Sequence, residues 1–273
     1  MSSIRNALML GVALVLGSAA GVHAADLYGG GSIKDAGYLP TPAPAPSMYF
    51  RLDGGFTRFD KPSMVEDGYY DFTETHLDDS YSFGGGVGMY FTRNIRGDIT
   101  YTHLFDSDAG GHLRDCCAPM PGVRDFKFKS DVVLANLYYD FNAGGRFSPY
   151  IGAGLGYAWN KTTAGTITPD PCLCTGPGTM DPGKTGHVAA ALMAGVTWKL
   201  TGRPTPVGST KDGVVMADSG RGLYLDAGYR FLYLGKVSTG PDRDACGGIV
   251  GRDPLVEDIH AHEFRVGLRY DFR

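Results

Sequence analysis

Apolar residues recur at every second position over much of this chain, and the clearest case is the stretch Pro149–Trp159. Successive side chains of a strand point to opposite faces, so this stretch has one apolar face and one almost bare face. The apolar face carries Ile151, Ala153, Leu155, Tyr157 and Trp159, and the bare face carries Gly152, Gly154, Gly156 and Ala158. A soluble sheet would show polar side chains opposite its apolar face, whereas a lipid-embedded barrel turns the apolar face to lipid and packs small residues inside. The stretch therefore predicts a membrane-barrel strand.

Eight segments of the chain follow this two-residue period. An even strand number is typical of bacterial membrane barrels, whose strands alternate apolar outward positions with small or polar inward ones. The last segment is a strong example, because its aromatic and aliphatic residues share one parity and its charged residues share the other. We therefore predict an all-β fold, an eight-stranded antiparallel transmembrane β-barrel. The predicted strands are Ser47–Phe59, Ser80–Thr92, Ile95–Phe105, Phe126–Phe141, Ser148–Asn160, His187–Leu200, Gly222–Leu234 and His260–Phe272.

The connections between these segments alternate between short and long. Short turns are predicted at Thr92–Asn94 and Asn142–Arg146, which contain residues that tight turns favour. Short periplasmic turns and long extracellular loops are expected of a membrane barrel. One connection departs from the rule: Thr201–Arg221 is long where a short turn is expected, so either the sixth or seventh strand runs past the membrane as a hairpin or the parity there is shifted. The predicted outer loops, which lack the two-residue period, are Asp60–Asp79, Asp106–Asp125, Lys161–Gly186 and Gly235–Ile259.

The N-terminal residues 1–24 have the features of a secretory signal peptide: Arg5, an apolar run from Ala7 to Ala20, and small residues before Ala24. We expect cleavage near Ala24 and export of the mature chain to the outer membrane of a Gram-negative cell. Residues 25–46 contain a proline-rich tract that cannot form regular backbone hydrogen bonds, so we expect an extended periplasmic lead-in. The barrel is then assigned to residues 47–273.

The composition agrees with a barrel rather than with a helical membrane protein. After the predicted leader, no segment approaches the roughly 18 consecutive apolar residues that a membrane-spanning helix requires. Glycine accounts for 41 of 273 residues and aromatic residues for 12%, as expected for strands that use every second residue to face lipid. Loss of Arg5 with the leader changes the formal charge from −4 to −5, and this acidic balance does not suggest a nucleic-acid partner.

The predicted inward positions carry eight basic and seven acidic residues. An eight-stranded barrel is just wide enough for side chains to fill, so we expect these charges to pair and to plug the interior. The alternative is a narrow charge-lined pore or a proton path. The basic set is Arg51, Arg96, Lys127, Lys129, Lys199, Arg230, Arg265 and Arg269, and the acidic set is Asp53, Asp98, Asp131, Asp140, Asp226, Glu263 and Asp271.

All five cysteines fall in predicted outer loops, and an exported protein permits disulfides. An odd count leaves at least one thiol unpaired within the chain, and the connectivity cannot be deduced from the sequence. A soft-metal site is the alternative, but the spacing lacks the two-residue spacer of recognised zinc sites, so no metal site is predicted. The cysteines are Cys116, Cys117, Cys172, Cys174 and Cys246.

No catalytic or cofactor site is predicted. His187, His260 and His262 lie near the expected outer rim, but no serine or aspartate pattern places a catalytic triad beside them. Outer-membrane lipases and lipid-A-modifying enzymes carry His and Ser on a barrel wall, so a lipid-modifying enzyme is the alternative of this class. The three-glycine pattern that ends at Gly156 lies inside a predicted strand and opens no helix, unlike a nucleotide-binding loop.

Three stretches of this chain resemble the small outer-membrane proteins of alphaproteobacteria, the porin-family barrels related to OmpA and OmpX. They are Pro149–Tyr157, Leu134–Phe141 and, most specifically, His262–Phe272, which is similar to the C-terminal strand that the barrel assembly machinery recognises. Arg273 follows the final aromatic residue, which departs from that pattern. The resemblance implies an envelope-structural or surface-antigen role, with heme binding or adhesion through the outer loops in some relatives, and it carries over no catalytic residue.

We therefore predict a non-enzymatic outer-membrane barrel with a structural or surface-interaction role. Its expected partners are outer-membrane lipids, lipopolysaccharide and the barrel assembly machinery, together with an unidentified extracellular ligand on the outer loops. A narrow porin or small-solute channel is the rival function, and a lipid-modifying enzyme is the third.

Overall fold

The computed structural model describes most of the chain after residue 47. In the described ranges the regular structure is β-strand, and none of their residues form a helix long and apolar enough to cross a membrane. The predicted signal peptide and proline-rich lead-in lie outside these ranges. The described ranges are 48–66, 70–114, 121–141, 146–170, 176–201, 204–210, 213–218, 222–251 and 254–272.

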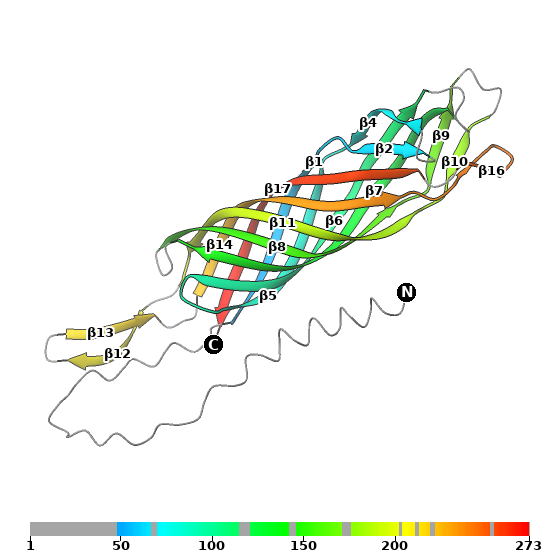
Figure 1. Cartoon of the computed structure of the whole chain (residues 1–273). Helices are drawn as coiled ribbons and strands as arrows, with labels where there is room; N and C mark the ends of the chain where they lie inside the picture. The colour runs from blue at the N-terminus through cyan, green and yellow to red at the C-terminus, as the bar shows by residue number, and fades with distance from the viewer. Residues whose placement is uncertain are drawn as a thin grey trace, which may run out of the picture. The chain divides into compact units, whose positions relative to one another are not determined.

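Eight long strands pair antiparallel with their neighbours in chain order, and the last pairs back with the first (Figure 1). The prediction of a closed antiparallel barrel is confirmed for the described residues, and each predicted strand lies within or largely overlaps one of the eight. A closed ring leaves no unpaired strand edge in its wall. The strands are β1 (Met48–Phe59), β5 (Ser80–Tyr90), β6 (Ile95–Leu113), β7 (Gly122–Asp140), β8 (Phe147–Thr162), β11 (Lys184–Lys199), β14 (Gly222–Ser238) and β17 (Leu255–Phe272).

The wall of the barrel is apolar on the outside, with the parity that the sequence predicts. Leu155 and Leu192 each expose 63% of their surface, whereas Ala158 and Ala191 on the opposite parity are buried. An exposed apolar belt that runs around a protein is atypical of soluble monomers and is what a lipid-facing wall requires. Seven strands contribute a large exposed aliphatic residue to this belt: Leu52, Val87, Ile99, Leu137, Leu155, Leu192 and Val266.

The glycine face of β8 lies in a crowded interior, as predicted. A side-chain carbon added at Gly154 would collide with the Asn136 side chain, and one added at Gly156 would collide with the Val133 backbone carbonyl. These positions tolerate no side chain because the neighbouring strand approaches closely. Glycine lowers intrinsic strand propensity, so close packing rather than propensity accounts for its presence here.

The two ends of the barrel differ. At one end, which we call the turn end, the chain reverses directly between β5 and β6, where the Phe91 amide donates to the Ile95 carbonyl at 2.9 Å. The first and last barrel residues also meet at this end, because Met48 pairs with Phe272. The opposite end, which we call the loop end, carries the connections between β1 and β5, between β6 and β7, between β8 and β11, and between β14 and β17.

The loop end contains far more strand than predicted, and the expectation of loops without a two-residue period is wrong. Both β6 and β7 run on past the predicted boundaries, to Leu113 and from Gly122. A register shift between Leu104 and Ser107 explains the miss on β6, because the inward side chains change from even to odd positions there. Seven short strands lie in the same connections: β2 (Ser63–Glu66), β3 (Tyr70–Asp71), β4 (Thr73–Leu77), β9 (Gly165–Pro169), β10 (Gly178–Met180), β15 (Asp242–Arg243) and β16 (Ile249–Gly251).

The long connection at the turn end contains a hairpin. Strands β12 (Pro204–Thr210) and β13 (Gly213–Asp218) pair with each other in a separate two-stranded sheet. The barrel strands themselves end at Lys199 and begin again at Gly222. Because the buried and exposed positions of β11 and β14 keep the predicted parity, the hairpin is the correct alternative and a parity shift is not.

Candidate functional site

The barrel interior gathers eleven buried charged side chains near the turn end and the middle of the barrel. Five are basic and six are acidic, so the cluster is close to neutral. Each comes from an inward position of a barrel strand, and the arginines are at most 8% exposed. The cluster comprises Arg51, Arg96, Arg230, Arg265, Arg269, Asp53, Asp98, Asp140, Asp226, Glu263 and Asp271.

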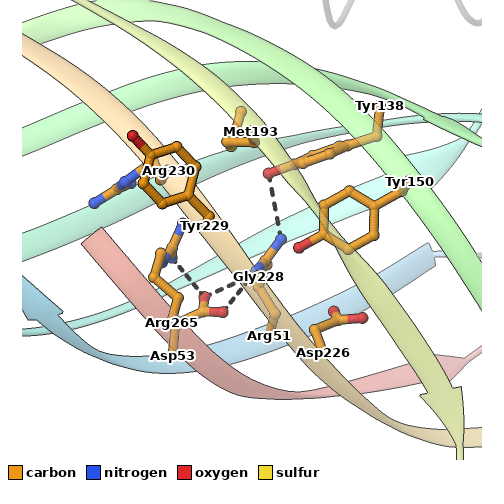
Figure 2. Close-up of a pocket in the computed structure, with 10 residues that line it drawn as sticks. All are labelled: Arg51, Asp53, Tyr138, Tyr150, Met193, Asp226, Gly228, Tyr229, Arg230 and Arg265. Carbon is orange, nitrogen blue, oxygen red and sulfur yellow. Dashed lines mark hydrogen bonds and ion pairs between the residues drawn. The ribbon is translucent and has the colours of Figure 1, made fainter. Parts of the chain in front are cut away.

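Arg51 lies at the centre of this network (Figure 2). Its guanidinium donates to both carboxylate oxygens of Asp53, at 2.9 and 2.6 Å, and to Asp98 Oδ2 at 3.3 Å. A further N–H donates to the Tyr138 hydroxyl at 3.3 Å. Arg265 approaches the same Asp53 carboxylate at 3.1 Å. The two-point pairing with Asp53 fixes the orientation of the guanidinium. The contacts with Asp98 and Tyr138 then link β1 to β6 and β7 through the interior.

Arg230 and Arg96 are also paired with carboxylates. Arg230 donates through Nε to Glu263, which also accepts a hydrogen bond from Ser82. Arg96 pairs with Asp140 at 3.0 Å and lies over the Tyr138 ring, 4.2 Å from its centroid. Cationic groups over aromatic faces gain electrostatic stabilisation when desolvated. The interior is therefore filled by ion pairs, as the sequence predicts for a plugged barrel, and by arginine–aromatic contacts, although two buried nitrogens each of Arg96 and Arg269 have no hydrogen-bond partner among the described residues.

The free space inside this network is small. A cavity of about 10 Å³ lies beside Arg51, and this is close to the lower limit for holding one water molecule. Figure 2 shows arginine and acidic side chains pointing into it together with two tyrosines. The lining residues are Arg51, Asp53, Tyr138, Tyr150, Met193, Asp226, Gly228, Tyr229, Arg230 and Arg265.

An apolar layer separates the charged network from the loop end. Phe59 of β1 and Phe128 of β7 meet with ring centroids 5.7 Å apart, although these strands are not neighbours in the ring. Their rings therefore meet across the interior. Leu104 and Leu232 are also fully buried on the loop-end side of the network. An ion crossing the barrel would have to leave water in this layer, which is costly.

Three of the predicted inward charges lie on the outer face instead. Lys127 pairs with Asp108 at 2.7 Å, and Lys129 approaches Asp106 at 3.6 Å. Asp131 accepts from Lys161 at 2.6 Å. The assignment fails because β7 extends beyond the apolar belt, where the outer face meets water and charged side chains no longer need to turn inward. Lys199 keeps its inward parity at the turn end and is half-buried.

Sequence reasoning missed a second buried ion cluster, at the loop end. Arg124 of β7 donates to Glu66 at 2.7 Å and to Asp242 at 2.6 Å, and all three side chains are fully buried. Arg124 also lies 4.8 Å from the centroid of the Phe72 ring. The carboxylates come from β2 and β15, so the cluster ties β7 to the connections that precede β5 and β17. Its one sequence signal is that Arg124 continues the inward parity of Phe126 and Phe128.

The loop end has its own apolar core around this cluster. Met64, Leu113, Ile167 and Met180 are each at most 2% exposed, and they come from four different strands. On the surface, the Arg243 guanidinium donates to Asp181 at 2.8 Å, and this hydrogen bond lowers the pKa of the Asp181 carboxyl below its ordinary value. The loop end is therefore a packed cap rather than a set of separate loops.

His260 and His262 lie on the outer face of β17, and His187 of β11 approaches Tyr233 of β14. His262 contacts Asp60 at 3.2 Å and the Tyr229 hydroxyl at 2.5 Å. His260 stacks on Phe231 with ring centroids 5.6 Å apart, and the centroid of His187 lies 6.0 Å from that of Tyr233. This belt of aromatic and imidazole rings is typical of a membrane–water boundary.

One of the five cysteines lies within the described residues. Cys246 is exposed at the loop end, in a turn whose amides donate to Asp244. The other four cysteines lie outside the described residues, so the disulfide prediction stays a prediction. Among the described residues, no group of three or more His, Cys, Asp or Glu side chains is placed to hold a metal ion.

Comparison with known proteins places this chain among outer-membrane barrels. A family model described as an outer membrane protein beta-barrel domain matches residues 7–272. Similar sequences include uncharacterized proteins of Brucella abortus and Brucella melitensis, each 26% identical over 291 residues that cover 94% of this chain and 94% of the relative.

Three similar solved structures share low identity with this chain. Neisserial surface protein A is 18% identical with a TM-score of 0.42, and the match covers 84% of this chain and 99% of that one. OprG from Pseudomonas aeruginosa is 13% identical with a TM-score of 0.45, covering 82% and 96%. The protease OmpT from Escherichia coli is 10% identical with a TM-score of 0.42, covering 83% and 96%. At these values none of them carries an argument about the function of this chain.

Proposed function

Because this chain belongs to the outer membrane protein β-barrel family and is located in the outer membrane, we propose that it is a closed, non-enzymatic barrel with an envelope-structural and surface-interaction role. Its turn end faces the periplasm and its loop end faces the exterior, since short turns are periplasmic in barrels of this class. The single observation that carries the proposal is the filled interior.

The filled interior argues against transport as the main role. Ion pairs occupy the width of the barrel around Arg51, and the contact between Phe59 and Phe128 adds an apolar barrier above them. An eight-stranded barrel leaves little space beyond its own side chains. A narrow pore would require both layers to rearrange.

The packed loop end supports a surface role. Rigid binding surfaces avoid the entropy cost of ordering a flexible segment when a partner binds. The Arg124 cluster and the apolar core hold the loop-end strands in one arrangement, and their outer surface is free of lipid. An extracellular partner would meet a preformed surface there.

Single-channel recording tests the closed barrel. Folded protein inserted into a planar bilayer should give no unitary current steps in concentrated potassium chloride. Phe128→Ala should introduce a leak, because it opens the apolar layer, whereas Phe264→Ala should not, because Phe264 faces lipid and is 61% exposed. Regular current steps from the unaltered protein would support the narrow-pore alternative and overturn the proposal.

Lipid analysis addresses the enzyme alternative. Outer membranes from cells with and without the protein should contain the same lipid species in the same ratios. Loss or transfer of an acyl chain or phosphate group only where the protein is present would establish a lipid-modifying activity instead.

A further inference from the structure

The hairpin at the turn end is a sheet of only two strands. Strand β12 pairs with β13, and within the described residues neither of them pairs with any other strand (Figure 1). An isolated two-stranded hairpin is marginally stable in water, and a stable sheet usually requires three or more strands. Each strand has one edge that faces its partner and one edge, which we call its outer edge, that faces away. A further strand on an outer edge would stabilise the hairpin.

The register of the hairpin determines which backbone groups lie on the outer edges. Thr210 pairs with Gly213 across a two-residue connection, so these two residues exchange backbone hydrogen bonds. Bonded and non-bonded pairs then alternate along the antiparallel ladder, and the bulge between Pro206 and Gly208 lies opposite a bonded residue of β13. The residues of β13 whose amide and carbonyl groups lie on its outer edge are therefore Val214, Met216 and Asp218.

The outer edge of β12 cannot accept a further strand. Pro204 pairs with Asp218 and Pro206 pairs with Met216, so both prolines lie on this outer edge. Proline has no amide hydrogen and therefore interrupts a hydrogen-bonded ladder. The sequence of β13 contains no proline, so its outer edge has a donor and an acceptor at every second residue. The hairpin thus has one blocked edge and one edge that can pair.

The outer edge of β13 is complementary to itself. Antiparallel pairing centred on Met216 would place Met216 opposite Met216 of a second copy, and Val214 opposite Asp218 of that copy. Each such bonded pair exchanges two hydrogen bonds, so the contact would contain about six. The one charged residue of β13, Asp218, would face a valine and not a like charge. The product would be a four-stranded sheet whose two remaining edges are both blocked by the prolines of β12.

We propose that β13 pairs with β13 of a second copy of this chain, and that the prolines of β12 limit the assembly to two copies. The pairing has closed two-fold symmetry, which is the commonest symmetry of homo-oligomers. Copies in one membrane have their turn ends on the same side, and this raises the effective concentration of one hairpin around another. The inference goes beyond the proposed function, because it depends on the hairpin and not on the filled interior.

Sedimentation equilibrium of the folded full chain in density-matched detergent micelles tests the proposal over a series of concentrations. The unaltered chain should reach a protein mass twice that of one copy. Met216→Pro removes two hydrogen bonds between copies but none within the hairpin, because the Met216 amide lies on the outer edge. Its dimer should dissociate roughly 5- to 150-fold more readily, as expected for the loss of two hydrogen bonds. The matched control Met216→Thr keeps the amide and should dimerise like the unaltered chain.

A second variant tests the blocked edge. Pro204→Thr with Pro206→Val restores two donors to the outer edge of β12 and should produce assemblies of more than two copies. This gain of assembly is the opposite of the loss that a merely unfolded hairpin would cause. A single-copy mass for the unaltered chain, an unweakened dimer in Met216→Pro, a weakened dimer in Met216→Thr, or a proline double variant that stops at two copies would each overturn the proposal. A heat-dependent shift in gel mobility confirms that the barrel of every variant is folded.

Discussion

Leu192→Arg tests whether the apolar belt meets lipid. Leu192 lies on β11 six positions before Trp198, which is near the turn-end boundary of the belt. With about 3.4 Å per residue and a strand tilt of about 40°, Leu192 stands roughly 16 Å above Trp198 along the membrane normal. The apolar band of such barrels is about 25 Å tall, so Leu192 lies within a few ångströms of its middle.

An arginine at this depth should lower the free energy of unfolding by about 2–4 kcal/mol. Ile249 offers a matched control, because it is 61% exposed, close to the 63% of Leu192, but belongs to β16 at the loop end. Ile249→Arg should change stability by less than about 0.5 kcal/mol, as is usual for surface substitutions. Reversible urea unfolding in phosphatidylcholine vesicles measures both variants.

The stability losses of the two variants together show whether the apolar belt meets lipid. A large loss for Leu192→Arg with little change for Ile249→Arg places the belt in lipid and the cap in water. Equal losses would show that arginine disturbs strand packing at either place. No loss at Leu192 would refute the assignment of this face to the bilayer.

Three other predictions follow from the packing. Gly154→Leu should prevent folding, seen as loss of the heat-dependent gel shift, because the added side chain overfills the interior. Arg124→Met should destabilise the loop end by about 3–5 kcal/mol, because two buried carboxylates lose their cation, and proteolysis should then cut the cap while the barrel stays intact. A membrane-impermeant maleimide should label the exposed thiol of Cys246 on intact cells, and labelling only after lysis would reverse the orientation of the barrel.

The barrel strands could be predicted because the membrane imposes a rule on both faces of every strand. Leu155 and Gly154 are neighbours in sequence with opposite requirements, one set by lipid and the other by the close approach of Asn136. Such a rule acts locally, so a period of two in the sequence is enough to reveal it. The hairpin after Lys199 could be proposed from the sequence as one of two alternatives, because the long connection there interrupts a regular alternation of short and long connections.

The loop end was not predictable in the same way. The register shift after Leu104 moves the inward positions from one parity to the other, and a simple alternation test loses the strand there. The sequence predicts inward positions for Lys129 and Asp131 because it does not mark the height at which lipid gives way to water. Arg124 and Asp242 are 118 residues apart, and no local pattern links an arginine to a partner at that distance.

The charged interior explains why the strands take one register, although it adds little to net stability. Buried ion pairs recover only part of the cost of desolvating their charges, so Arg51 and Asp53 are weak evidence for a gain in free energy. A slip of β1 by one residue, however, would turn both charges to lipid and would turn Phe50 and Leu52 toward the polar interior. An arginine facing lipid costs about 2–4 kcal/mol at mid-depth. A slip of β17 by one residue would carry a similar penalty, because Arg265 and Arg269 share its inward face. The paired charges therefore discriminate against wrong registers more than they stabilise the correct one.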